Sequence, residues 1–219
     1  MSIIIAIDGP AAAGKGTLGQ RLEEHFKLAK LDTGLLYRAT GFKVLSQGGD
    51  PEDAQVAEAA ARALDPADLS NPDLRTDEAA QAASKVSAIP GVRAALLDFQ
   101  HNFAKNPPNL ADGSPANGAI LDGRDIGTTV CPNAEVKLFV TASTEIRAKR
   151  RFKELQERGL EAIYARVLDD MKERDARDSS RSASPLMAAD DALLLDTSDM
   201  DADQAFAAAF DFITAKNLF

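Results

Sequence analysis

Hydrophobic and polar positions along the chain form short apolar runs separated by longer amphipathic stretches. A short apolar run bounded by turn residues is typical of a buried strand, and apolar positions three and four residues apart indicate a helix. The predicted strands are 3–7, 28–31, 119–121, 136–140 and 192–195. The predicted helices are 15–25, 34–46, 93–104, 144–158, 160–174 and 201–216. Because most strands are followed by a helix, we expect a three-layer α/β/α fold around a five-stranded parallel sheet.

Two zones interrupt this alternation. Residues 47–77 are rich in Ala, Asp and Pro, and residues 105–118 (KNPPNLADGSPANG) have the Pro, Asn and Gly content of a surface loop. Within residues 50–78 Val56 and Thr76 are the only β-branched residues and there is no aromatic residue. We therefore expect a helix over 51–64 followed by a loop, and no small sheet.

Length and composition restrict the class of protein. The 219 residues suit one compact α/β domain with an inserted flap. No apolar run approaches the roughly 20 residues of a membrane span, and the start MSIIIAIDGP lacks a basic n-region and a cleavage site, so we expect a cytoplasmic protein. Cys131 is the only cysteine and there are two histidines, which argues against a disulfide, a thiol metal cluster and a zinc site.

Charge is distributed unevenly along the chain. Lys and Arg number 25 against 34 acidic residues, and this net charge of −9 argues against a general nucleic-acid or anionic-membrane binder. Residues 147–181 nevertheless hold 11 basic and 8 acidic side chains. The segment is either a helix pair with i,i+4 salt bridges on its surface or part of an anion site.

The stretch IDGPAAAGKGTLGQRL (7–22) contains the pattern G-x-x-x-x-G-K directly after a predicted strand and directly before a predicted helix. Glycines let backbone N–H groups converge on phosphate oxygens, and the helix N-terminus and the lysine add positive charge. We predict a phosphate-binding loop formed by Gly9, Pro10, Ala11, Ala12, Ala13, Gly14, Lys15, Gly16 and Thr17.

Gly16 follows the lysine, where many phosphate-binding loops carry the Ser or Thr that ligates magnesium, and the hydroxyl comes one residue later at Thr17. The chain has no N-K-x-D motif, no D-x-x-G followed by a suitable switch region and no long apolar Walker B strand. A switch GTPase and a motor or transport ATPase are therefore minor alternatives. The G-K-G-T variant and the compact size resemble nucleoside monophosphate kinases.

Transfer of a phosphoryl group between two nucleotides brings two polyanions together, so catalysis depends mainly on positioning and electrostatic stabilisation. No general base is strictly required. Arginines from several parts of the chain are required, and the candidates are Arg38, Arg93, Arg124, Arg147, Arg151, Arg174 and Arg181. Arg147 and Arg151 are four residues apart and share one face of a predicted helix.

Three further stretches resemble the signatures of bacterial cytidylate kinases. They are KLDTGLLYRATG (30–41), LDGRDIGTTVCPNAEVKLFVTAS (121–143) and KERDARDSSRSASPL (172–186), and with the glycine-rich loop they cover nearly the whole chain in the family's order. The resemblance implies phosphoryl transfer from ATP to CMP or dCMP, with Mg²⁺, in pyrimidine nucleotide metabolism. It also implies a P-loop kinase fold with a small flap that binds the nucleoside monophosphate and a short lid.

The resemblance assigns roles to individual residues. Cytosine presents an amino donor beside two acceptors, so a carboxylate should face the amino group and cationic or hydroxyl donors the acceptors. The implied acceptor-binding residues are Thr33, Arg38, Ser84, Arg93, Arg124, Asp125, Arg174, Asp178 and Arg181, and the implied catalytic residues are Lys15, Arg124, Arg147, Arg151 and Arg174. Thr33 is also expected to cap its helix. Thr17 and Asp122 are candidates to hold Mg²⁺, the latter through water, and adenine contacts are expected near Pro185.

We expect one P-loop kinase domain over 1–219, with its core at 1–46, 119–150 and 182–219, the flap at about 47–104, a loop at 105–118 and the lid at about 151–181. The chain lacks the β-rich insert common in the family. We expect a monomer that binds small nucleotides and neither nucleic acid nor membranes. The alternatives are a kinase of another small acceptor such as UMP, and a non-catalytic nucleotide-binding regulatory module, which would have no reason to retain the acceptor-side arginines together.

Overall fold

The structure, a computed structural model, describes residues 3–181 and 183–219, and the backbone alone at Pro66. The predicted core positions 1, 2 and 182 lie outside the described residues. The chain forms two compact units. The sheet unit comprises the described residues up to Leu31 together with Ala104–Phe219, and the helical unit comprises Asp32–Phe103. The predicted single domain with core, flap and lid remains a prediction.

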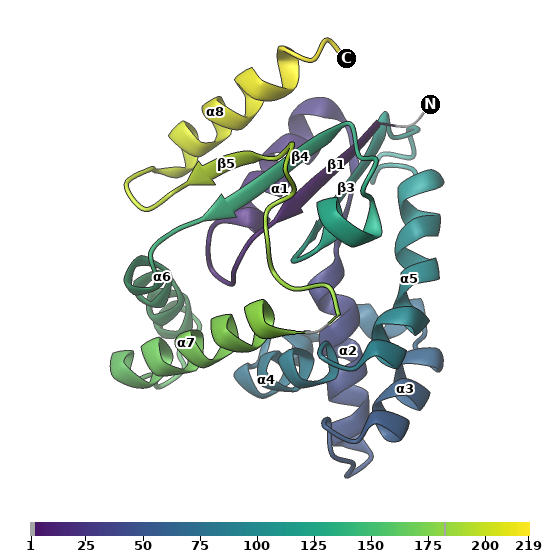
Figure 1. The fold of residues 1–219 in the computed structure, drawn as a ribbon, viewed down its shortest axis with the longest axis vertical. Coiled ribbons are helices and arrows are strands. Elements are labelled where there is room, and N and C mark those ends of the chain that lie inside the picture. Colours follow the sequence, from purple (N-terminus) through teal and green to yellow (C-terminus); the bar gives the residue numbers. More distant parts are fainter. Residues whose placement is uncertain (1–2, 182) are drawn as a thin grey trace. The chain divides into compact units, whose positions relative to one another are not determined.

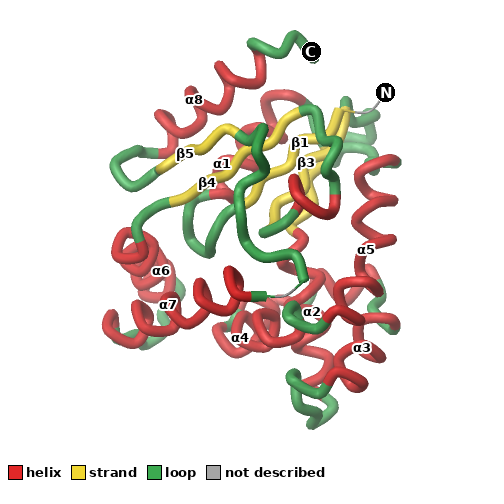
Figure 2. Tube along the Cα trace, viewed as in Figure 1, coloured by secondary structure: helices red, strands yellow, loops and turns green. Residues whose placement is uncertain are grey.

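The five predicted strands all form, and they build one parallel sheet in the order β2-β3-β1-β4-β5 (Figures 1 and 2). Their bounds are β1 (Ile3–Asp8), β2 (Ala29–Asp32), β3 (Gly118–Gly123), β4 (Val136–Thr141) and β5 (Leu193–Asp196). This confirms the predicted α/β class with a five-stranded parallel sheet. Gly118, predicted as loop, begins β3. A Cβ there would lie 2.1 Å from the carbonyl oxygen of Ile3 on β1, so glycine allows the two backbones to approach closely at this point.

The described part of the sheet unit also contains four complete helices and one short turn. They are α1 (Lys15–Phe26), α6 (Thr144–Glu157), α7 (Tyr164–Ser180), α8 (Ala202–Thr214) and the π-helical turn η3 (Ile126–Val130). Ser143 caps α6 and Asp201 caps α8, each through its side chain. The predicted helix 160–174 had the wrong bounds, because Gly159 at φ +71° ends the preceding helix and the chain becomes helical again at Tyr164. The turn η3 was not predicted.

Helices α1 and α8 pack against each other and against the sheet, as Figure 1 shows. Ile5, Ile7, Leu22 and Ile213 are completely buried in this core. The ring of Phe26 on α1 stacks on that of Phe210 on α8, at 5.8 Å between centroids. Burial of such side chains is the main favourable contribution to the stability of the sheet unit.

The helical unit is built from α2 (Thr33–Ser46), α3 (Ala54–Arg62), α4 (Asp77–Val86) and most of α5 (Pro90–Lys105), with 3₁₀ turns at η1 (Pro66–Ser70) and η2 (Pro72–Arg75). Helices α2 and α4 approach closely at Gly41, where a Cβ would lie 2.8 Å from the Cβ of Ala82. The predicted helix 51–64 is present as α3, and the described residues 50–78 contain no strand, as expected. No helix in the described part of the chain is long and apolar enough to span a membrane.

Candidate active site

The predicted phosphate-binding loop joins the end of β1 to α1. Gly9 and Gly14 have φ of +143° and +101°, and Ala12 has φ of +58°. The backbone of the loop therefore turns sharply at these positions. Gly14 precedes α1 and, within the described structure, offers no side-chain cap. A helix N-terminus of this kind favours an anion, as the sequence predicts.

A small apolar cluster holds the outer side of this loop. Ala11 and Ala12 pack against side chains of α6 and α7, including the buried Leu155, Val167 and Met171. The loop therefore rests on the two helices that carry the positive segment of the sequence.

Lys15 and Asp122 lie next to each other at the carboxyl ends of β1 and β3. The Nζ atom of Lys15 donates to the carbonyl of Pro10 at 2.9 Å and lies 3.8 Å from Oδ1 of Asp122. Both side chains are buried. A buried cation beside a phosphate-binding loop stabilises negative charge more strongly than an exposed one, because water screens it less.

Asp8, the last residue of β1, fixes the turn that follows the D-G-R-D stretch. Its two carboxylate oxygens accept from the N–H groups of Ile126 and Gly127, each at 2.7 Å. The pKa of Asp8 is raised to about 6: burial is the largest cause and nearby Asp125 adds to it, whereas the two amides and Lys15 act to lower it. Asp8 is not among the residues predicted from the sequence.

Arg124, Asp178 and Arg181 form a charged cluster in the sheet unit, in which Asp178 is buried and Arg124 is partly buried. Nε of Arg124 donates to Oδ2 of Asp178 at 3.1 Å, and Nη1 of Arg181 lies 3.9 Å from Oδ1 of the same carboxylate. Burial opposes ionisation of Asp178, but the charges of Arg124, Arg174 and Arg181 together hold its pKa below the ordinary value. Three predicted acceptor-side arginines therefore converge on one carboxylate.

Arg147 has a hydrogen-bond partner for each of its five N–H groups. They donate to the carbonyls of Ala142 at 2.9 Å and Ala11 at 3.3 Å, to the hydroxyl of Thr144 at 3.0 Å, and to Oδ1 and Oδ2 of Asp175 at 3.1 and 2.6 Å. Its side chain is 4% exposed. The catalytic role predicted for Arg147 remains a prediction.

The surface salt-bridge interpretation of the positive segment holds for part of it, and the anion-site interpretation remains a prediction. Exposed pairs such as Lys153 with Glu157 and Lys172 with Asp169 are surface salt bridges of small energetic value. Arg151 pairs with Glu154 at 2.7 Å and is more buried, and its predicted contact with phosphate remains a prediction.

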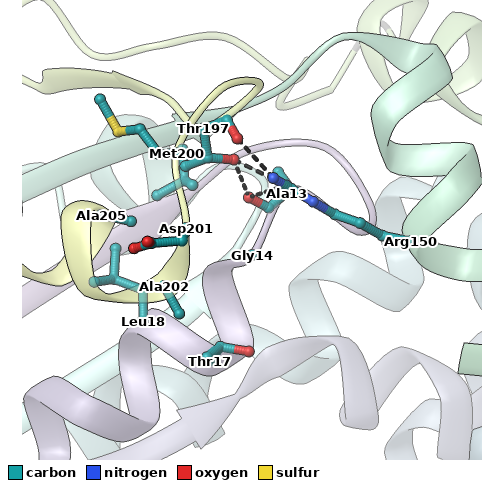
Figure 3. A pocket seen from close by; sticks show the side chains of 11 residues that line it. Ala13, Gly14, Thr17, Leu18, Arg150, Thr197, Met200, Asp201, Ala202 and Ala205 are labelled. Carbon is teal, nitrogen blue, oxygen red and sulfur yellow. Dashed lines mark hydrogen bonds between the residues drawn. The ribbon is translucent and has the colours of Figure 1, made fainter. Parts of the chain in front are cut away.

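A pocket of about 270 Å³ lies beside the phosphate-binding loop, between α1 and the segment that enters α8 (Figure 3). Arg150 points into it and donates to the hydroxyl and the carbonyl of Thr197, at 2.9 and 2.6 Å, and toward the carbonyl of Ala13 at 3.5 Å. Met200 and Ala205 provide apolar walls. Pro185, near which adenine contacts were predicted, is not one of the described residues that line the pocket.

Within the helical unit, Arg38 belongs to α2 and Arg93 to α5. Arg38 donates to the carbonyls of Leu74 at 2.8 Å and Thr76 at 3.3 Å. The guanidinium of Arg93 lies over the ring of Tyr37, 5.5 Å from its centroid. Both side chains are thus held in place by their own unit.

Thr33 and Ser84 are buried residues of the helical unit. The expected capping role of Thr33 was wrong: Asp32 is the cap residue, in extended conformation, and its carboxylate accepts from N–H of Gly34 at 2.9 Å. The hydroxyl of Ser84 has no hydrogen-bond partner among the described residues. A buried polar atom of this kind is expected to bond to a ligand or to water.

The residues predicted for Mg²⁺ have suitable chemistry. Thr17 presents an exposed hydroxyl in the first turn of α1, and Asp122 presents a buried carboxylate beside Lys15. Magnesium binds such oxygen donors through one or two protein groups and completes its shell with water and phosphate oxygens. No group of three or more His, Cys, Asp or Glu side chains in the described residues is arranged to hold a metal. The Mg²⁺ site remains a prediction.

Sequence reasoning missed Asp8, Arg150, Asp175 and Thr197. Asp8 directly precedes the glycine-rich loop, and a carboxylate ending an apolar strand is a signal that was available. Arg150 lies between the two arginines that were chosen from the same helix. Nothing in the local sequence pairs Asp175 with Arg147 or Thr197 with Arg150, since these contacts join segments 28 and 47 residues apart.

The parallel sheet and the glycine-rich loop between β1 and α1 define a P-loop protein. The family model for cytidylate kinase matches residues 5–215. The cytidylate kinase of Paramagnetospirillum magneticum is 64% identical over 99% of this chain and 100% of its own, and that of Rhodospirillum rubrum is 59% identical over 98% and 99%. The chain belongs to the cytidylate kinase family.

Solved structures with low sequence identity share the fold. An uncharacterized protein from Eubacterium ventriosum matches with a TM-score of 0.55 at 13% identity, over 98% of this chain and 99% of the other. A shikimate kinase from Bacteroides thetaiotaomicron matches with a TM-score of 0.50 at 11% identity, over 97% of both chains. At such identities the likeness concerns the fold alone.

Proposed function

We propose that this chain transfers the γ-phosphoryl group of ATP to CMP or dCMP, releasing ADP and CDP or dCDP. A phosphate oxygen of the acceptor forms a bond to the γ-phosphorus while the bond from that phosphorus to the bridging oxygen of ADP breaks. Membership of the cytidylate kinase family supports the reaction. The alternatives, a kinase of another acceptor and a non-catalytic module, are not favoured.

One observation in the sheet unit carries the proposal. Strands β1 and β3 pair in parallel with Asp8 opposite Gly123, so the glycine-rich loop and the Arg124–Asp125 stretch begin side by side. Ligands of open α/β sheets bind at this carboxyl edge. A donor phosphate on the loop and an acceptor phosphate on Arg124 would therefore be neighbours, as in-line transfer requires.

The proposed chemistry is positioning and charge stabilisation. Lys15, Arg124, Arg151 and Arg174 stabilise the charge that spreads over the transferring group, and the N–H groups at the start of α1 hold the donor phosphates. Exclusion of water by the lid suppresses hydrolysis of ATP and strengthens each of these contacts.

The proposed acceptor residues divide between the two units. In the sheet unit they are Arg124, Asp125, Arg174, Asp178 and Arg181, and in the helical unit Thr33, Arg38, Ser84 and Arg93. Asp125 accepts from the amino group of cytosine, and Ser84, Arg93 and Arg181 donate to its N3 and O2. The buried hydroxyl of Ser84, which no described residue bonds, supports its assignment.

We propose that the pocket beside the loop receives the base of ATP. It lies against Gly14 and Thr17, next to the proposed phosphate site, and its apolar walls and the planar guanidinium of Arg150 suit a flat aromatic ring. Thr17 and Asp122 would hold Mg²⁺. When bound, the ion neutralises phosphate charge during transfer.

The reaction is tested by ADP release in a coupled assay with CMP, dCMP, UMP, AMP and GMP as acceptors. We expect turnover with CMP or dCMP at a kcat/KM well above that with AMP and GMP. Equal rates with AMP, or no turnover with CMP, would overturn the proposal. If the rate with UMP equalled the rate with CMP, the result would support the alternative that the chain is a kinase of another small acceptor.

The base assignment is tested by Asp125→Ala, with Asp211→Ala on the exposed face of α8 as the matched control. Loss of a charged hydrogen-bond partner costs about 1.5–3 kcal/mol, so kcat/KM for CMP should fall by at least about tenfold. The control should match the wild type. An unchanged value for Asp125→Ala would remove this residue from the site.

A further inference from the structure

Arg147 joins its own helix to three other parts of the sheet unit through one buried side chain. Its five N–H groups bond to Ala142 just after β4, to Thr144 on its own helix, to Ala11 in the phosphate-binding loop and to Asp175 on α7. A guanidinium has five N–H donors and no more. In this arrangement the donors of Arg147 are fully used by the protein itself.

The contact with Asp175 is the strongest of these bonds. It is a bidentate pair in which both carboxylate oxygens accept, at 3.1 and 2.6 Å. Paired N–H donors in a plane fix orientation as well as distance, so a pair of this kind resists rotation of either partner. The pair therefore restricts the rotation of α7 about its own axis.

The orientation of α7 matters because the neighbours of Asp175 are proposed acceptor residues. Arg174 precedes it by one residue, and Asp178 follows one turn after Arg174 on the same face. Asp178 is bonded to Arg124 at 3.1 Å. A small rotation of α7 would move Arg174 and Asp178 together relative to Arg124.

We propose that Arg147 and Asp175 are a positioning pair: Arg147 acts through Asp175 to set the orientation of α7, and thereby of Arg174 and Asp178, and does not itself bind phosphate. Because Arg147 also bonds to Ala11, the pair ties the acceptor-side helix to the loop that holds the donor phosphates. The inference rests on the proposed function, since it predicts which substrate each variant affects.

The test is a double-mutant cycle with Asp175→Asn and Arg147→Lys, measured as KM for CMP and KM for ATP. Asp175→Asn keeps the shape of the side chain and leaves Arg147 intact, but it loses one acceptor and the charge. We expect each single change to raise KM for CMP roughly tenfold, within the range for contacting pairs. In the double variant, KM for CMP should be no higher than in the more strongly affected single variant. Asp175→Asn should change KM for ATP by less than about twofold, since it removes no contact to the loop.

Two results would overturn the inference. If Arg147 acts directly on phosphate, Asp175→Asn will bind CMP like the wild type. If the two residues act independently, their effects on KM for CMP will multiply in the double variant. A general loss of structure would lower the active fraction and hence the apparent kcat without a selective change in KM, whereas a positioning role raises KM for CMP selectively.

Two further variants complete the design. Asp169→Asn, an exposed carboxylate on the same helix that lies 4.0 Å from Lys172, should behave like the wild type. Asp175→Glu keeps the charge and the two oxygens, and it should restore most of the CMP affinity even if Asp175→Asn folds poorly. A Glu variant as weak as the Asn variant would count against the inference. Absence of CMP turnover in the wild type would instead refute the proposed function.

Discussion

The buried carboxylate of Asp8 makes the stability of this fold depend on pH in an unusual direction. Its pKa is raised from 3.8 to about 6, with burial as the largest cause. An acid with a raised pKa binds its proton more tightly in the folded state than in the unfolded state. Stability from this group is therefore present at low pH and is lost as pH rises through about 6.

The magnitude follows from the size of the shift. Each pKa unit corresponds to about 1.4 kcal/mol, so the complete change is about 3 kcal/mol, and about 2 kcal/mol of it falls between about pH 4.5 and about pH 7. Asp8→Asn has no carboxyl proton to bind at this position. We therefore expect the free energy of unfolding of the wild type, relative to that of Asp8→Asn, to fall by about 2 kcal/mol across this interval.

The measurement is urea unfolding followed by far-UV circular dichroism at both pH values, on the wild type and the variant. Asp68→Asn is the control. The amide of Asp65 and the side chain of Lys43 lower the pKa of Asp68, so its titration lies below 3.8 and the difference should stay flat between the two pH values. A wild-type advantage over Asp8→Asn that is constant, or that grows with pH, would refute the reasoning.

Four further outcomes follow from the loop and its pocket. Lys15→Ala should lower kcat by at least about 10²-fold while far-UV circular dichroism stays unchanged, because its charge stabilises the transferring group; near-normal activity would show the phosphate assignment to be wrong. Gly9→Ala should destabilise the fold by about 3 kcal/mol or more in urea unfolding, since its φ is +143° and a Cβ would lie 1.9 Å from the carbonyl oxygen of Val140. Gly14→Ala, with φ of +101° but no described atom within 4 Å of the added Cβ, should cost only about 1 kcal/mol, and equal costs would contradict this account. Arg150→Ala should raise KM for ATP about tenfold with little change for CMP, and an unchanged KM for ATP would exclude the pocket as the base site.

The elements of the fold were largely predictable because their signals are local. Five apolar runs became five strands, and the glycine-rich loop lies where a strand meets a helix. The bounds of α7 were missed because Gly159 and the chain up to Ile163 interrupt a pattern that otherwise continues. Thr33 and Asp32 are both good cap residues, and only the backbone conformation decides between them.

The contacts that organise the candidate site were not predictable in the same way. The turn η3 forms on the carboxylate of Asp8, which precedes Ile126 by 118 residues. Likewise, the sequence indicates that Arg147 carries a charge in a positive helix, but not that Asp175 and Ala11 occupy its donors. The residue types of a site can be recognised from a motif, whereas the partners that hold them arise only from the tertiary structure.

The packing of Ala11 and Ala12 against α6 and α7 couples the local opening of the loop to that of the helix pair. The apolar contacts that support the loop also support α6 and α7. Local opening of the loop therefore exposes apolar surface of the two helices, and opening of the helices exposes apolar surface of the loop. A ligand that binds the closed loop stabilises both by the same free energy. Amide hydrogen exchange in α6 and α7 should therefore slow when ATP alone is added, before any acceptor is present.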